Sequence, residues 1–334
     1  MKIHFDWRLA RVIDEDGLTL DEIEWDGKIT PSSVAKRLSI MQNGRRLPEV
    51  ATLLERFPLA TPDPLGAISD PEWPRDKSSD HIIEKAAELL AKSGVADSSG
   101  DMDRRLDMLV STTMELRASW TTAESRCVEW VGLFITEADL DSQRGEIPLA
   151  TGDSSSISEL ADRLGVAVPK HQPSQSEWES IHSLASAVNN SSEIIDHVEG
   201  SIREIANSYF PSLSALMGPI SAAKLIVLAG GRERLARMPS GSLQVLGAHA
   251  AMAAHRRGAP PPKHGAVLFS MPQVSRSPRW LRGKIARYLA GKASIAIRVD
   301  HFGGEIWGRE KIDEINSEID SIKAKFPKPP KRGK

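Results

Sequence analysis

The chain has 334 residues, 40 % of them hydrophobic and 26 % charged, which is ordinary for a soluble protein of two or three domains. The formal net charge of −2 hides an uneven distribution, because residues 218–334 carry 22 Lys and Arg against 8 Asp and Glu, while residues 1–217 carry 21 against 37. The single Cys127 excludes an internal disulfide, and the longest apolar run, Leu225 to Ala229, is too short to span a bilayer. We therefore expect the C-terminal part to meet a polyanion.

The start of the chain, Met1 to Trp7, has charged side chains where a secretory signal needs an apolar run. We expect a cytoplasmic protein with no membrane partner. Residues 1–75 are predicted to form a small α/β domain, in which Asp14-Glu15-Asp16-Gly17 between two short apolar runs predicts a hairpin turn. Five prolines between Pro58 and Pro74 predict an ordered or semi-rigid connection, and the pattern becomes helical from His81.

Residues 76–217 are predicted to be helical, with two stretches in which apolar residues recur at intervals of three and four. Two such helices should pair antiparallel as a coiled-coil hairpin, with residues 141–175 as a loop or short helical tip between them. The pattern leaves open whether the seam closes within one chain or also pairs with a second copy. Cys127 is expected on a buried helix face. The seam candidates are Leu106, Leu109, Leu116, Trp120, Ile181, Leu184, Val188, Ile195, Val198 and Ile202.

Residues 218–308 are predicted to form an all-α domain with a cationic face, since the chain has no acid between Glu233 and Asp300. A helix over residues 279–299 would place Leu281, Ile285 and Leu289 on one arc and Lys284, Arg287 and Arg298 on another. The proline-rich loop over residues 258–265 is stiff and would present Lys263 and His264 to phosphates, although a packing role suits His264 equally. The candidates for RNA contact are Arg256, Arg257, Lys263, His264, Arg276, Arg279, Arg282, Lys284, Arg287 and Arg298.

Residues 309–334 are predicted to form a helix, Arg309 to Lys323, followed by a basic tail that contains prolines. Four isoleucines at helical spacing mark the buried side of this helix. The tail is expected to add RNA affinity without sequence preference.

Several motifs follow one another in order through residues 218–300, and together they resemble the Nop domain of archaeal Nop-five proteins, relatives of eukaryotic Nop fifty-six and fifty-eight. Glu129-Trp130-Val131-Gly132-Leu133-Phe134 is similar to a degraded form of another signature of that family. The motifs of the Nop domain are Gly218-Pro219-Ile220, Leu225 to Gly230, Leu235 to Ser240, Leu243 to Ala248, Pro262 to Gly265, Ser277 to Trp280, Arg282 to Arg287 and Ile297 to Asp300.

The resemblance implies a non-catalytic scaffold of a box C/D small ribonucleoprotein, which guides ribose 2'-O-methylation of ribosomal RNA in an archaeal cell. It implies that residues 1–75 dock the methyltransferase fibrillarin, that the helical hairpin over residues 76–217 joins two copies, and that residues 218–308 bind guide RNA together with a kink-turn-binding ribosomal-like protein. S-adenosylmethionine is expected only on fibrillarin, because this chain has no glycine-rich strand-to-helix turn to hold it. Neither a metal site nor a catalytic residue is predicted.

One family motif is altered. Gly247, Ala248, His249 and Ala250 stand where the family has Gly-Ala-Glu-Lys, and these four are the candidates for the joint contact with RNA and the partner protein. Two alternative functions also fit the sequence. The chain could stabilise another kink-turn particle, as the spliceosomal relative does, or act as a coiled-coil adaptor that binds no RNA.

Overall fold

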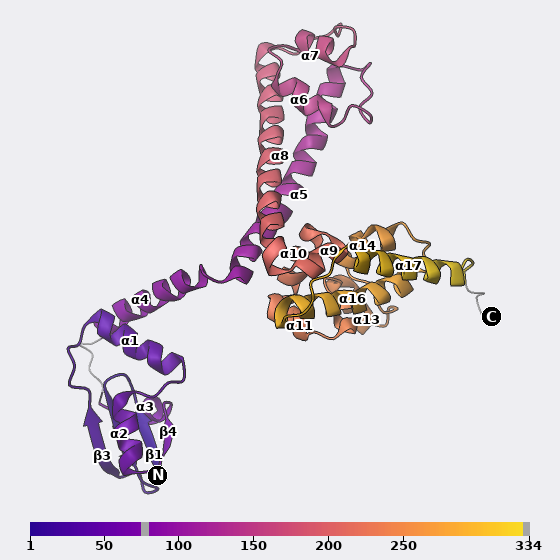
Figure 1. The fold of residues 1–334 in the computed structure, drawn as a ribbon. Coiled ribbons are helices and arrows are strands. Elements are labelled where there is room, and N and C mark those ends of the chain that lie inside the picture. The colour runs from indigo at the N-terminus through magenta and orange to yellow at the C-terminus, as the bar shows by residue number, and fades with distance from the viewer. Residues whose placement is uncertain (75–79, 330–334) are drawn as a thin grey trace. The chain divides into compact units, whose positions relative to one another are not determined.

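The computed structural model describes residues 1–74 and 80–329, and the chain divides into two compact units, Met1–Asp101 and Met102–Lys334 (Figure 1). The first unit extends past the predicted domain end at residue 75, because the helix α4 (Asp80–Ser98) packs against α1 (Pro31–Gln42). Ala86 of α4 is fully buried beside Val34 of α1.

The first unit contains a sheet of four strands in the order β3-β2-β1-β4. The predicted hairpin is confirmed, since β2 and β3 are antiparallel and Asp14 Oδ1 accepts hydrogen bonds of 2.9 Å from the backbone N–H groups of Asp16 and Leu18. β1 pairs antiparallel with β2 and parallel with β4. The strands are β1 (Lys2–Phe5), β2 (Leu9–Ile13), β3 (Thr19–Glu24) and β4 (Thr61–Asp63).

The proline-rich stretch from Pro58 to Pro74 belongs to the fold of this unit rather than being only a connection. It supplies the strand β4 and the short helix α3 (Gly66–Ser69). Proline has no backbone N–H to donate, and Pro62 is tolerated in β4 because this strand lies at the edge of the sheet. Its tertiary pairing with β1 was not visible in the sequence, because three residues are too few to show alternation. The remaining helix of the unit, α2 (Pro48–Arg56), buries Val50 and Leu53 against the sheet.

The second unit begins with the predicted antiparallel helical hairpin of α5 (Met102–Phe134) and α8 (Gln175–Tyr209). Arg117 of α5 donates from Nε to Glu199 Oε1 at 3.1 Å, and Cys127, further along α5, packs with Val188, which is earlier in α8. The two helices are therefore antiparallel. The segment between the two helices is a helical tip with its own buried cluster. It contains α6 (Glu146–Gly152) and α7 (Ile157–Leu164).

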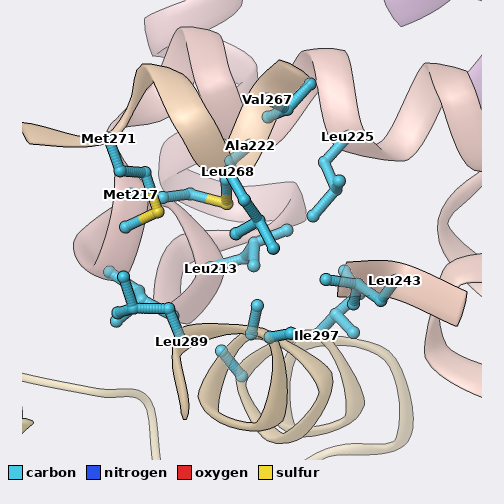
Figure 2. Close-up of a cluster of buried hydrophobic side chains, with 14 of the residues drawn as sticks. Leu213, Met217, Ala222, Leu225, Leu243, Val267, Leu268, Met271, Leu289 and Ile297 are labelled. Carbon is cyan, nitrogen blue, oxygen red and sulfur yellow. The ribbon is translucent and has the colours of Figure 1, made fainter. Parts of the chain in front are cut away.

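The remainder of the second unit is all α-helical, as predicted, and is built around α16. Figure 2 shows Leu289 and Ile297 of this helix facing Leu213, Leu243 and side chains of the surrounding helices. α10 ends directly before Gly230, which has a φ of +82°. The helices are α9 (Pro211–Met217), α10 (Pro219–Ala229), α11 (Arg232–Arg237), α12 (Ser240–Gln244), α13 (His249–Arg256), α14 (Ala266–Ser270), α15 (Pro272–Ser275), α16 (Arg282–Phe302) and α17 (Arg309–Lys325).

The central helix α16 begins three residues later than predicted and also ends three residues later. Its start is delayed because residues 276–281 form a turn, in which the Pro278 carbonyl accepts hydrogen bonds from the N–H groups of Leu281 at 2.8 Å and Arg282 at 3.3 Å. α17 follows the prediction and buries Ile315 and Ile319. Its basic tail lies beyond the described residues from residue 330 onward.

No single helix in residues 1–74 and 80–329 is long and apolar enough to cross a membrane, whereas α9 and α10 taken together, with a bend of 116° between them, pass the same test of length and composition.

Candidate nucleic-acid interface

The acid-free segment, residues 234–299, contains twelve Lys and Arg residues and runs from α11 to α16 of the second unit. Because the structure describes all of it, each predicted RNA contact can be located. Two of the candidates, His264 and Arg282, are half-buried. The exposed candidates are Arg256, Arg257, Lys263, Arg276, Arg279, Lys284, Arg287 and Arg298.

The loop that carries Lys263 and His264 is fixed to the domain at its C-terminal end. The Gln244 side chain donates from Nε2 to the Lys263 carbonyl at 2.6 Å, and the Gly265 N–H donates to the Gln244 carbonyl at 2.7 Å. A Cβ atom at Gly265 would lie 1.9 Å from the Leu246 carbonyl oxygen, so only glycine allows this approach. The backbone that carries Lys263 and His264 is therefore held in place before any ligand binds.

Arg282 has an internal role that its prediction as a phosphate contact did not anticipate. Its guanidinium donates from Nε to the Ser277 carbonyl at 2.9 Å and from Nη2 to the Ser275 carbonyl at 3.0 Å. It also lies over the ring of Phe269, 5.4 Å from the centroid. Arg282 thus joins the start of α16 to α14 and α15, and two of its N–H groups are already used.

The two predicted faces of α16 are present. Ile285 and Leu289 are fully buried, and Lys284, Arg287 and Arg298 are exposed. Two of these cations also contact the domain itself. Lys284 Nζ lies 3.8 Å from the centroid of the Phe326 ring after α17, and Arg298 Nε donates to the Ala236 carbonyl at 3.0 Å. The half-buried Lys292 turns towards Tyr288, 5.3 Å from its ring centroid.

The altered motif, Gly247 to Ala250, leads into the exposed start of α13. Gly247 has a φ of +81°, a backbone conformation that disfavours any other residue, and a Cβ there would approach Leu228 Cδ1 to 3.3 Å. Ala248 is half-buried, whereas His249 and Ala250 are exposed. The motif therefore combines a fixed backbone with side chains that a partner can reach.

The predicted seam residues are all buried or half-buried on α5 and α8, where Leu106 and Ile202 join the core of the helical domain and Ile181 joins that of the tip. Leu106, Ile181 and Ile202 are fully buried. The two helices thus close a hairpin within one chain, while half of the seam residues stay only half-buried. Pairing of the same seam with a second copy stays a prediction.

Sequence reasoning missed the polar contacts that fasten the base of the hairpin to the helical domain. Asp103 of α5 accepts hydrogen bonds from the Arg232 N–H, at 2.9 and 3.0 Å, and from the Tyr209 hydroxyl, at 3.1 Å. The Arg232 guanidinium lies 3.9 Å from the centroid of the Tyr209 ring. Asp300 of α16 caps α9 by accepting from the N–H groups of Ser212 and Leu213. The partners in each of these contacts are far apart in the sequence, so no local pattern predicts them.

Among the residues that the structure describes, no group of three or more His, Cys, Asp or Glu side chains is placed to hold a metal ion. The site presents a cationic surface that includes the exposed ring of Phe269. Guanidinium and ammonium groups bind phosphate oxygens, and such contacts position a nucleic acid without reading its bases.

Comparison with known proteins identifies the family of this domain. Residues 133–321 match the Nop family, described as "snoRNA binding domain, fibrillarin". The chain is 33 % identical over 253 residues to an uncharacterised NOP5 family protein of Methanocaldococcus jannaschii, covering 70 % of this chain and 57 % of that one. It is 36 % identical over 143 residues to nucleolar protein 56 of Homo sapiens, covering 40 % of this chain and 24 % of that one.

The chain thus spans little more than half the length of the archaeal relative and about a quarter of the human one. A solved crystal structure of a fibrillarin/Nop5p complex aligns with 91 % of this chain and 95 % of the chain compared, with a TM-score of 0.43 and 22 % identity. The family match begins at Leu133, near the end of α5, and so includes α8 as well as the helices that follow. Because this match covers more than half of the sequence, the chain belongs to the Nop family.

Proposed function

We propose that the protein is a non-catalytic scaffold of a box C/D small ribonucleoprotein that guides ribose 2'-O-methylation of ribosomal RNA in the cytoplasm of an archaeal cell. The observation that carries this proposal is the acid-free segment, which lies in a domain of the Nop family and presents eight exposed Lys and Arg candidates. Twelve cations without an acid among them favour a phosphate backbone as the ligand.

The RNA is proposed to bind together with a kink-turn-binding ribosomal-like protein. The exposed cations would hold the phosphates, while the start of α13, with His249 and Ala250, would meet the composite surface of RNA and protein. Loss of the family's Glu and Lys at these two positions leaves a smaller, less charged surface there. Contacts with the partner protein at this point are therefore expected to depend on shape more than on ion pairs.

The first unit is proposed to dock fibrillarin, which would bring its S-adenosylmethionine to the particle. Three apolar side chains close together in the sequence are strongly exposed around β4 and α3, namely Leu59 at 85 %, Leu65 at 69 % and Ile68 at 74 %. Exposed apolar side chains that form a contiguous group are typical of a protein-binding surface, and these three lie within ten residues of the chain. We assign the docking of fibrillarin to this group, which we call the β4–α3 patch.

A second copy of the chain is proposed to associate through the outer surface of the helical hairpin or its tip. Support comes from large apolar side chains that the closed seam leaves exposed, including Met108 at 63 %, Leu133 at 69 % and Ile194 at 47 %. Pairing through such residues would join two scaffolds without opening the seam.

The proposed function is tested by a gel-shift titration on an RNA that contains a box C/D kink-turn, with and without the kink-turn protein, beside an RNA lacking the kink. We expect tight binding that requires both the kink and the partner. Equal binding to every RNA would reduce the cationic face to a non-specific patch. Absence of binding would overturn the proposal and favour a structural coiled-coil adaptor.

A paired variant sharpens this test. Lys263→Ala with Arg287→Ala removes two exposed cations of the acid-free segment, and we expect weaker RNA binding. The slope of log affinity against log salt should become shallower by roughly one for each phosphate that the variant no longer neutralises. Arg126→Ala is the matched control, since that exposed arginine lies on α5 and pairs with Glu129 at 2.8 Å. Because the control removes one positive charge where the test variant removes two, a loss about half as large in free energy would show that only net charge matters.

A further inference from the structure

A stacked aromatic pair, the half-buried His264 and the exposed Phe269, lies within the acid-free segment. The rings of His264 and Phe269 are stacked, with centroids 4.8 Å apart and planes inclined by 12°. Phe269 is 37 % exposed, and it is the one aromatic side chain of residues 234–299 among the exposed large hydrophobic residues. Trp280 and Tyr288 of the same segment are half-buried. Phe269 is thus the most exposed of the Phe, Trp and Tyr rings of the cationic segment.

The pair is held in place from both sides. His264 belongs to the loop end that Gln244 fixes through the Lys263 carbonyl and the Gly265 N–H. Phe269 lies under the Arg282 guanidinium, which two backbone carbonyls hold. A ligand that stacks here would find the rings already ordered, so it would lose little conformational entropy of the protein on binding.

The surroundings favour a nucleobase over an apolar side chain as the occupant. Phe269 already has His264 stacked on it and Arg282 over its ring, so the His264 ring, which Phe269 supports, is the one that can offer a flat face to a base. The exposed Lys263 beside His264 is suited to the phosphates that accompany the base. In a paired helix both faces of each base are covered by neighbours, so only an unpaired base can reach a ring on a protein surface.

We propose that His264 and Phe269 form a stacking platform for one unpaired nucleobase of the RNA. This inference rests on the proposed function, and it adds to it a contact with a base where the cations supply contacts with phosphates. It also gives Arg282 a defined task, which is to hold the platform.

The test uses the full-length protein with the kink-turn protein and a kink-turn RNA in which each unpaired nucleotide in turn is replaced by fluorescent 2-aminopurine or by an abasic site. Phe269→Leu keeps an apolar side chain and removes the ring, and we expect about tenfold weaker binding to the intact RNA. The same variant should show no further loss on the RNA that is abasic at the stacked position. At that position 2-aminopurine fluorescence should be quenched by the wild type and not by Phe269→Leu.

Three controls separate the outcomes. Phe269→Trp should bind like the wild type, because it retains a stacking ring. Phe302→Leu removes a ring that is 59 % exposed at the end of α16, outside the acid-free segment, and should also bind normally. Since stacking releases no counterions, Phe269→Leu should leave the salt dependence unchanged.

Failure of this inference differs from failure of the proposed function. If the wild type binds the RNA and Phe269→Leu binds equally well, the platform is overturned while the scaffold remains. If the variant is weaker and no abasic position removes the difference, the ring contacts the partner protein and the platform is again overturned. If the wild type binds no RNA, the proposed function fails as well.

Discussion

At the scale of single residues, the fold decides what each polar side chain can do. Arg282 and Arg287 both lie in the first two turns of α16 and look equivalent in the sequence. Arg282 donates to two carbonyls inside the domain, whereas Arg287 is exposed. An acid can likewise be occupied inside the fold. Glu199 is buried on α8 and pairs with Arg117 and, at 2.9 Å, with Arg203. Charge alone therefore overestimates the number of cations available to RNA.

Cys127 makes stability depend on pH. The side chain is fully buried in the hairpin, and burial, with a smaller contribution from Glu124, raises the pKa of its thiol from 9.0 to about 11. The unfolded chain releases this proton at lower pH than the folded one, so the contribution of Cys127 to stability is complete below pH 9 and is lost as the pH rises towards 11. We expect a decrease of up to about 1.4 kcal/mol per pH unit in that window.

The measurement is urea unfolding of the wild type and of Cys127→Ala at several values between pH 8 and pH 11. The difference in unfolding free energy between the two proteins isolates the effect of the thiol from that of the tyrosines and lysines, which both proteins share. Parallel curves for the two proteins would show that the thiol does not titrate differently in the folded state.

At the scale of elements, the hairpin and the helical domain are fastened by capping contacts. Asp103→Ala leaves the first N–H group of α11 and the Tyr209 hydroxyl without the acceptor that they use in the fold. We expect a loss of about 1–3 kcal/mol in the stability of the second unit, measured by urea unfolding. Asp107→Ala is the matched control one turn later, because its carboxylate accepts only a long bond of 3.4 Å from Ser111. Equal losses of stability in both variants would contradict a fastening role for Asp103.

At the scale of the whole molecule, the two units have separate cores and separate proposed partners. Leu65→Glu places a charge in the β4–α3 patch, and we expect it to reduce fibrillarin capture in a pull-down by at least tenfold, because an unpaired carboxylate would be buried at the contact. RNA binding by the second unit should be unchanged. Leu18→Glu is the control, since Leu18 is 65 % exposed in the same unit, at the β2–β3 turn. Reduced capture by both variants would mean that the patch is not the docking site.

Much of the molecule could be predicted from the sequence. Helical spacing predicted the antiparallel hairpin and the buried and charged faces of α16, and turn residues predicted the β2–β3 hairpin. Ordered motifs placed the chain in the Nop family, and the family match agrees. These features are local, because spacing, turn chemistry and charge are properties of neighbouring residues.

Only the tertiary structure decided which residues remain for binding. The pairing of β4 with β1, the packing of α4 on α1, the stack of His264 on Phe269 and the anchoring of Asp103 to Arg232 each join residues that no short pattern links. The sequence by itself determined the helices, the family and the sign of the charge on each half. The folded chain determined the availability of each side chain, because a hydrogen bond between residues 103 and 232 exists only after the intervening helices have packed.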